Sequence, residues 1–125
     1  MAHKLRNIKL YILDIKNSVS NIFEYTDGMR YEDFELDKKT IDAVVRNFEI
    51  IGEAGNQLPR VFKIKYKNIE WRNLIDFRNV IIHEYFGVNI EIVWDIIHNE
   101  LPKLDNDIRE LIKQIDNGEI PIEWV

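Results

Sequence analysis

Hydrophobic residues recur along almost the whole chain at about the 3.6-residue period of an α-helix, and no segment alternates for long. This periodicity predicts an all-α fold, an up-and-down bundle of four helices with a short extended C-terminal tail. The 125 residues fit one domain, 1–125. Gly28 lies in a Thr-Asp-Gly turn and is expected to follow the end of the first helix.

Capping residues and helix breakers set the predicted helix boundaries. Asp37 and Asn89 are expected N-caps, Pro59 ends the second helix and Gly87 the third. Pro102 lies inside the fourth helix and is expected to kink or divide it. The four predicted helices cover roughly Lys4–Tyr25, Asp37–Leu58, Asn68–Tyr85 and Asn89–Asp116.

Two glycines lie on the hydrophobic stripe of the second helix. Gly52 and Gly55 each weaken a helix by about 1 kcal/mol relative to alanine. We therefore expect another helix to approach closely at this point.

The composition fits a soluble globular protein, with 46% hydrophobic and 31% charged residues. No apolar run approaches the roughly 18 residues that a membrane span needs. The first residues carry charges throughout their apolar part, unlike a secretory signal. The chain has no cysteine, which excludes disulfides and thiolate metal sites and fits a cytoplasmic protein.

The segment "FRNVIIHEYFG", residues 77–87, contains an arginine among hydrophobic residues. On one regular helix Arg78 falls near the centre of the apolar stripe, where an unpaired guanidinium costs several kcal/mol. Three arrangements relieve this cost. Arg78 can pair with a carboxylate such as Glu49 or Glu53, extend its charge to the surface, or hold an anion, most naturally a phosphate, in a cleft.

His83 has two interpretations. It can interact with the carbonyls at a helix end, or serve as an acid or base near neutral pH. On a regular helix Arg78 and His83 point about 140° apart. The two can share one site only if the helix loosens before Gly87 or if a symmetric dimer forms a common cleft.

Metal and cofactor sites are not expected. His3, His83 and His98 form no cluster with ligand spacing. No glycine-rich phosphate loop is present, and no serine pairs visibly with a base.

The motif Arg-x-x-x-x-His-x-Tyr, formed by Arg78, His83 and Tyr85, resembles the signature of HEPN domains and specifically of HepT-like toxins. The flanking stretches "FEIIGEAGNQLP", "WRNLIDFRN" and "VWDIIHNELPKL" resemble that family too. The resemblance covers most of the chain, from about Leu5 to Leu111. It implies an all-α HEPN bundle that forms a homodimer, with both motifs facing a shared cleft.

The resemblance also implies a metal-independent endoribonuclease. Arg78 would hold the scissile phosphate, and His83 would move protons as the RNA 2′-hydroxyl attacks it. The products would be a 2′,3′-cyclic phosphate and a free 5′-hydroxyl. Asn79 is a candidate for orienting the phosphate or His83.

The same resemblance gives Tyr85 a role. HepT-like toxins are paired with a minimal nucleotidyltransferase antitoxin (MntA-like), which transfers AMP to the motif tyrosine. An adenylate there would place charge and bulk beside Arg78. Without the resemblance, Tyr85 is an amphipathic residue at the edge of the core.

One basic segment stands out in a chain of net charge -5. Residues 60–72 contain five basic residues and one acid, whereas residues 24–37 contain six acids and one base. Aromatic residues interleave the basic ones, which suits RNA binding by phosphate contact and stacking, or a solvated loop whose aromatics pack inward. The candidate RNA-binding residues are Arg60, Lys63, Lys65, Lys67 and Arg72.

Two other functions remain open at this stage. The cleft of a helical dimer can bind a nucleotide or a partner without cleaving RNA. Alternatively, the bundle is only a dimerisation module, with Arg78 in an internal ion pair.

Overall fold

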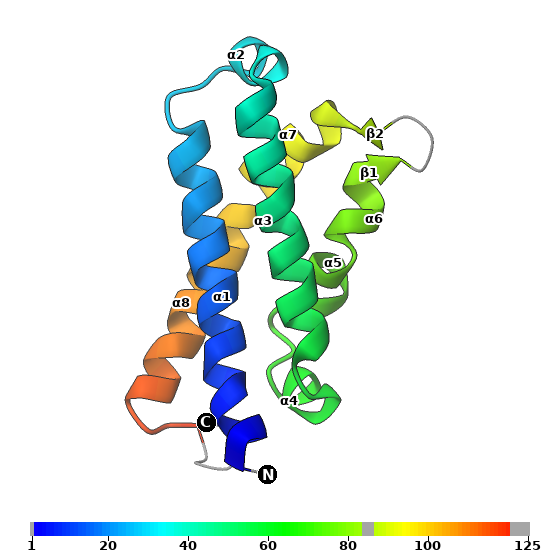
Figure 1. Cartoon of the computed structure of the whole chain (residues 1–125). Helices are drawn as coiled ribbons and strands as arrows, with labels where there is room; N and C mark the ends of the chain where they lie inside the picture. Colours follow the sequence, from blue (N-terminus) through cyan, green and yellow to red (C-terminus); the bar gives the residue numbers. More distant parts are fainter. Residues whose placement is uncertain (1, 84–86, 121–125) are drawn as a thin grey trace.

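The computed structural model describes residues 2–83 and 87–120, with side chains for 8–81 and 87–120. It is an all-α bundle with one short β-hairpin (Figure 1). The elements are α1 (Ala2–Thr26), α2 (Tyr31–Leu36), α3 (Lys38–Gln57), α4 (Arg60–Lys65), α5 (Trp71–Ile75), α6 (Phe77–Ile81), β1 (Ile82–His83), β2 (Gly87–Val88), α7 (Ile90–Asn99) and α8 (Leu101–Asp116).

The two long helices α1 and α3 lie side by side at the centre of the molecule (Figure 1). α8 packs against α1, while α5 and α6 pack against α3. Among the described side chains of α1, the apolar residues that face the core are buried, including Ile12, Ile15 and Ile22. No helix within the described ranges is both long and apolar enough to cross a membrane.

The expected caps and breaks are confirmed at several points. The side chain of Asp37 accepts a hydrogen bond from the backbone N–H of Thr40, and that of Asn89 accepts one from Ile92. Gly28 has a φ of 74°, which glycine adopts without strain. The predicted fourth helix divides into α7 and α8, and Pro102 lies in the first turn of α8, where no backbone donor is lost.

The predicted third helix, Asn68–Tyr85, is wrong as one continuous element. α5 ends before Asp76, whose side chain accepts a 2.7 Å hydrogen bond from Nδ2 of Asn79 across the junction with α6. α6 ends at Ile81, within a β-branched run that favours extended backbone. A hairpin follows, in which Ile82 pairs with Val88 and Gly87 has a φ of 78°.

The expected close approach at the α3 glycines is confirmed. A Cβ atom on Gly52 would lie 3.1 Å from the carbonyl oxygen of Ile75, and one on Gly55 would lie 3.1 Å from Cδ1 of Leu74. α5 therefore packs directly on the α3 backbone. This contact fixes the distance between α3 and α5, and thereby positions α6, which follows α5 and carries Arg78.

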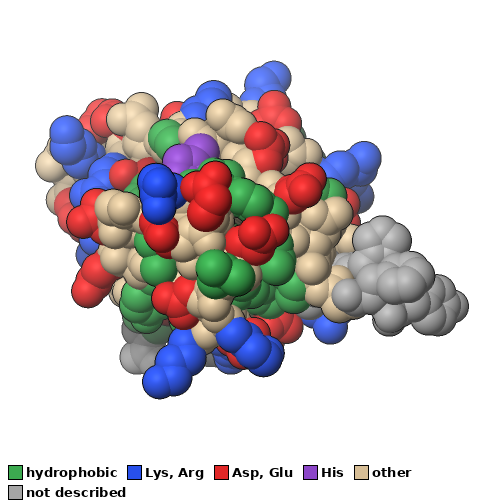
Figure 2. Space-filling model, turned by 90° about the horizontal axis from the view of Figure 1, so that it is seen from above, with side chains coloured by type: hydrophobic (Ala, Val, Ile, Leu, Met, Phe, Trp, Pro, Cys, Tyr) green, Lys and Arg blue, Asp and Glu red, His purple; other side chains and the backbone are tan. Residues whose placement is uncertain are grey.

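The end of the bundle near α2 carries much of the negative charge. Viewed along the bundle from that end, acidic side chains surround an exposed hydrophobic patch (Figure 2). Leu36 of α2 is 85% exposed. The acid-rich residues 24–37 belong to this end, whereas the basic segment lies at the α4 end (Figure 1).

Of the C-terminal tail, Ile120 is buried. The expected extended conformation of residues 121–125 lies outside the described residues.

Candidate active site

Arg78 lies on the surface of α6, and its side chain is 61% exposed. The expectation that it sits at the centre of a buried stripe is therefore wrong. α6 turns Phe77 and Ile81 into the core, and Phe77 packs edge-on against Phe48 of α3. Because the helix is interrupted at Asp76, the angles of one regular helix do not apply across the junction.

The ion pair considered for Arg78 is present. Nε of Arg78 donates a hydrogen bond to Oε2 of Glu49 on α3, at 3.3 Å. Both side chains reach solvent, and surface ion pairs of this kind contribute at most about 1 kcal/mol. The carboxylate can therefore give way to another anion.

The pair borders a groove of about 360 Å³ between α3 and the α5–α6 segment. Gly52 lies in the wall of the groove, and because it has no Cβ atom the carbonyl oxygen of Ile75 on α5 can come close to α3. Two basic and two acidic side chains meet here. The lining residues are Arg46, Glu49, Gly52, Glu53, Asn56, Ile75 and Arg78.

Sequence reasoning missed Arg46 and Asn56 as groove residues. Polar residues at positions 46, 49, 53 and 56 repeat every three or four residues, so they share one face of α3. That spacing is the signal that could have identified them.

Asn79 is exposed, and its bond to Asp76 ties it to the α5–α6 junction. Its suggested part in orienting a phosphate or His83 stays a prediction. The backbone of His83 forms β1 and pairs with Gly87, while its side chain lies outside the described residues. Tyr85 lies outside the described residues altogether.

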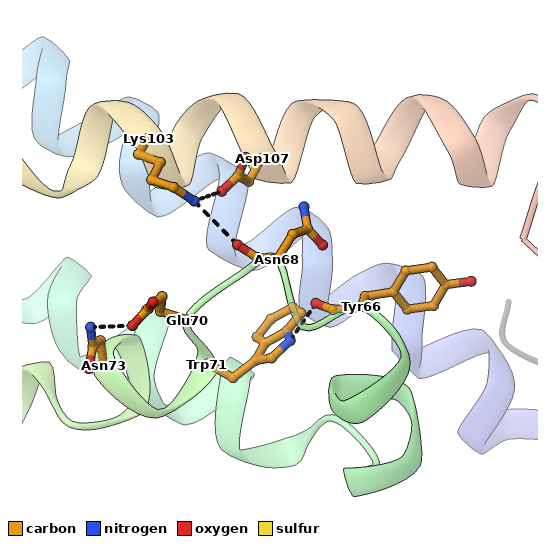
Figure 3. A network of polar contacts seen from close by, with 7 residues as sticks. All are labelled: Tyr66, Asn68, Glu70, Trp71, Asn73, Lys103 and Asp107. Carbon is orange, nitrogen blue, oxygen red and sulfur yellow. Dashed lines mark hydrogen bonds and ion pairs between the residues drawn. The ribbon is translucent and has the colours of Figure 1, made fainter.

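The aromatic residues of the basic segment pack inward. Phe62 and Trp71 are buried, and the Trp71 indole Nε1 donates to the carbonyl of Tyr66 at 3.0 Å (Figure 3). Phe62 and Tyr66 lie 4.7 Å apart between ring centroids. Phe62 and Trp71 are thus not available for stacking on RNA bases, as the solvated-loop interpretation expects.

The five basic side chains of this segment differ in their surroundings. Nζ of Lys63 donates to the carbonyl of Gly55 at 3.1 Å, and burial lowers the pKa of its ammonium group. Arg60, Lys65, Lys67 and Arg72 are exposed. These four exposed side chains can contact a phosphate group of a bound molecule, whereas Lys63 is hydrogen-bonded to the C-terminal part of α3.

A second cavity, of about 200 Å³, lies between α5 and the α7–α8 junction. Lys103 borders it and donates to Asp107 at 2.6 Å and to the carbonyl of Asn68 at 3.2 Å (Figure 3). Partial desolvation in the cavity wall raises the pKa of Glu100, although this residue remains exposed to solvent, and the negative charges of Asp95 and Glu70 add to the effect. None of the predicted site residues lines this cavity.

In the part of the chain that the structure describes, no three His, Cys, Asp or Glu side chains are grouped so that they could hold a metal ion.

Comparison with known proteins identifies the family. Residues 15–111 match the model of the family described as "Ribonuclease HepT-like". A Methanocaldococcus jannaschii protein named "Putative RNase" is 39% identical over 111 residues, which are 89% of this chain and 92% of that protein. A Thermococcus cleftensis protein named "Probable ribonuclease HepT" is 39% identical over 108 residues, covering 86% of this chain and 98% of that protein. No solved structure matches the chain significantly. The family match spans most of the chain and includes every residue that lines the groove, so this protein belongs to the HepT-like ribonucleases of the HEPN superfamily.

Proposed function

We propose that this protein is a metal-independent endoribonuclease toxin of a toxin–antitoxin pair. The family and the names of the relatives support RNA cleavage. The observation that carries the proposal is the position of Arg78, which is exposed in a groove and, among the described side chains, is paired with one surface carboxylate, that of Glu49. An RNA phosphodiester carries one negative charge, as that carboxylate does, and its two non-bridging oxygens can accept a two-pronged hydrogen bond from a guanidinium.

In the proposed reaction the nucleophile belongs to the RNA. The 2′-hydroxyl loses its proton and its oxygen attacks the adjacent phosphorus, while the bond to the 5′-oxygen of the next nucleotide breaks. That leaving oxygen takes up a proton. His83 is the group proposed to move these protons, and Arg78 the group that neutralises the charge developing on the phosphate.

The intramolecular nucleophile explains why the reaction can proceed without a metal ion. The 2′-oxygen is already next to the phosphorus, so no water has to be activated or positioned. Arginine supplies the positive charge that a metal ion provides in many other nucleases.

A dimer is part of the proposal because the family resemblance implies one, and two copies of the groove would then surround one RNA strand. The exposed side chains of Arg60, Lys65, Lys67 and Arg72 would add phosphate contacts away from the groove. Lys63 would have to give up its bond to Gly55 to take part.

The partner in this proposal is a nucleotidyltransferase antitoxin. It would join the Tyr85 hydroxyl oxygen to the α-phosphorus of ATP and release pyrophosphate. The attached AMP would add negative charge to the motif segment and would compete with RNA for the Arg78 guanidinium. This step rests on the family resemblance and on the presence of Tyr85 in the motif.

The test is RNA cleavage by purified protein in EDTA, with wild type compared with Arg78→Ala and His83→Ala. We expect cyclic-phosphate products from wild type only. Cleavage by both variants at the wild-type rate would rule out the catalytic assignment. Tight binding of RNA or nucleotide without any cleavage would favour a non-catalytic binding dimer instead.

The proposed inactivation by transfer of AMP to Tyr85 has a separate test. Intact mass is measured after co-expression with the nucleotidyltransferase gene product, in wild type and in Tyr85→Phe. Added mass in units of AMP that disappears in Tyr85→Phe supports the antitoxin step. Its persistence in Tyr85→Phe would place the modification elsewhere.

A further inference from the structure

Arg46 is an exposed side chain in the same groove as Arg78, but on the opposite wall. It belongs to α3, one turn before Glu49. Among the described residues it has no ion pair and no side-chain hydrogen bond. An arginine in this position is free to bind a group that enters the groove.

The absence of a partner is not due to a lack of carboxylates nearby. Glu49 lies three residues further along α3, a spacing at which an arginine and a glutamate commonly pair. Its carboxylate instead bonds to Arg78 on α6. Glu53, the other acid of the groove, follows Arg46 by seven residues, about 10 Å along the helix axis, and is not bonded to it.

The groove therefore holds two guanidinium groups, one from each wall, with a single carboxylate engaged between the walls. Arg46, Glu49 and Arg78 all line this groove, and Arg46 precedes Glu49 by three residues on α3. A chain of anions that displaces Glu49 from Arg78 would therefore also pass within reach of the long side chain of Arg46. One small anion needs only one of the two arginines. A polyanion with regularly spaced charges can use both at once.

We propose that Arg46 binds a second phosphate of the RNA strand whose scissile phosphate is held by Arg78. This inference rests on the function proposed above. The strand would then run across the groove from α6 onto α3, and Glu49 would occupy the site when RNA is absent. Arg46 binds the substrate in this arrangement and takes no part in proton transfer.

The test uses an RNA oligonucleotide with 2′-O-methyl groups, because it lacks the nucleophile and cannot be cleaved. Its affinity is measured by fluorescence anisotropy for wild type, Arg46→Ala and Arg46→Lys, at salt concentrations from about 50 to about 200 mM. Lys113→Ala is the matched control. It also removes one exposed positive charge, but from the last turn of α8, outside the groove.

For Arg46→Ala we expect weaker binding and a salt dependence that is shallower by about 0.7 in log–log slope, the value for one lost single-strand phosphate contact. Arg46→Lys keeps the charge and should keep most of the slope, and Lys113→Ala should match wild type. With cleavable RNA, Arg46→Ala should raise KM and change kcat little, in contrast to Arg78→Ala.

An unchanged affinity and slope in Arg46→Ala would overturn the inference. So would a loss of dimer in sedimentation at unchanged melting temperature, because Arg46 would then contact the second copy. If wild type cleaves RNA and Arg78→Ala does not, these results refute only the role of Arg46. If wild type neither binds nor cleaves RNA, the proposed function fails as well.

Discussion

Nε of Arg78 lies 3.3 Å from Oε2 of Glu49, and this contact joins the motif segment to α3 across the groove. The carboxylate occupies the place where the proposed function puts a phosphate. RNA therefore has to compete with Glu49 for the guanidinium.

Glu49→Gln should bind RNA more tightly than wild type. The change removes a negative charge from the groove and weakens the competitor for Arg78, and it should alter folding stability little because the pair is exposed. Anisotropy with the 2′-O-methyl oligonucleotide measures the effect. Glu110→Gln, an exposed position on α8, is the control for loss of one negative charge, and weaker binding by Glu49→Gln would contradict the competition.

Gly52→Ala should destabilise the protein more than Gly55→Ala. The new Cβ at position 52 would lie 3.1 Å and 3.3 Å from two backbone carbonyl oxygens of α5, which cannot move without shifting that helix. At position 55 the close atoms are side-chain carbons of Leu74 and Ile75, which adjust more easily. We expect a loss of about 1–2 kcal/mol for Gly52→Ala in urea unfolding, and a smaller change of either sign for Gly55→Ala.

Asn89→Ala should lower the free energy of unfolding by about 1 kcal/mol, since the side chain caps α7 by accepting from the N–H of Ile92. Asn89→Asp keeps the acceptor and should stay close to wild type. Denaturant melts followed by circular dichroism compare the three proteins. Equal losses in both variants would mean that the amide nitrogen, and not the cap, is the important group.

Glu100→Gln should stabilise the protein at neutral pH but not in acid. The pKa of Glu100 is raised in the folded chain by partial desolvation and by nearby negative charges. Because the folded chain binds this proton more tightly than the unfolded chain, protonated Glu100 favours the folded state. This contribution to the free energy of unfolding is fully present below the ordinary glutamate pKa of about 4.3 and is lost as the pH rises through the folded pKa. Glutamine does not ionise, so its advantage over wild type should shrink as the pH falls towards about 4.

Urea unfolding of wild type and Glu100→Gln, measured from neutral pH down to about 4, tests this prediction. Glu110→Gln again serves as the control. An advantage of Glu100→Gln that stays constant with pH would show that the carboxyl does not titrate differently in the folded chain.

The long helices and their caps could be predicted from the sequence because local signals determine them. Asp37, Asn89 and Pro59 act within one turn of their own positions, and the α3 glycines indicated a close contact. The short helices α2 and α4 were not predicted. Each is six residues long, too short for a helical period to stand out.

The candidate site was harder to predict because it depends on one interruption. Asp76 ends α5, and the phase of every later residue changes at that point. The wheel of a single helix placed Arg78 inside, while in the structure it is on the surface and opposite Glu49. The pairing with Glu49 was one of the arrangements considered, but no local pattern can select it, because the two residues are 29 positions apart.

The packing of α8 against α1 has a consequence for the order in which the chain folds. Lys9 and Asp116 form an ion pair across 107 positions of sequence, so this contact closes almost the longest loop that the chain allows. Closing so long a loop costs more chain entropy than joining α1 to α3, which a short connection links, so we expect the contact between α8 and α1 to form late. Until α8 docks, a partly folded chain would expose the part of the apolar α1 surface that α8 covers in the folded bundle, and a second unfinished chain could place its own α8 there.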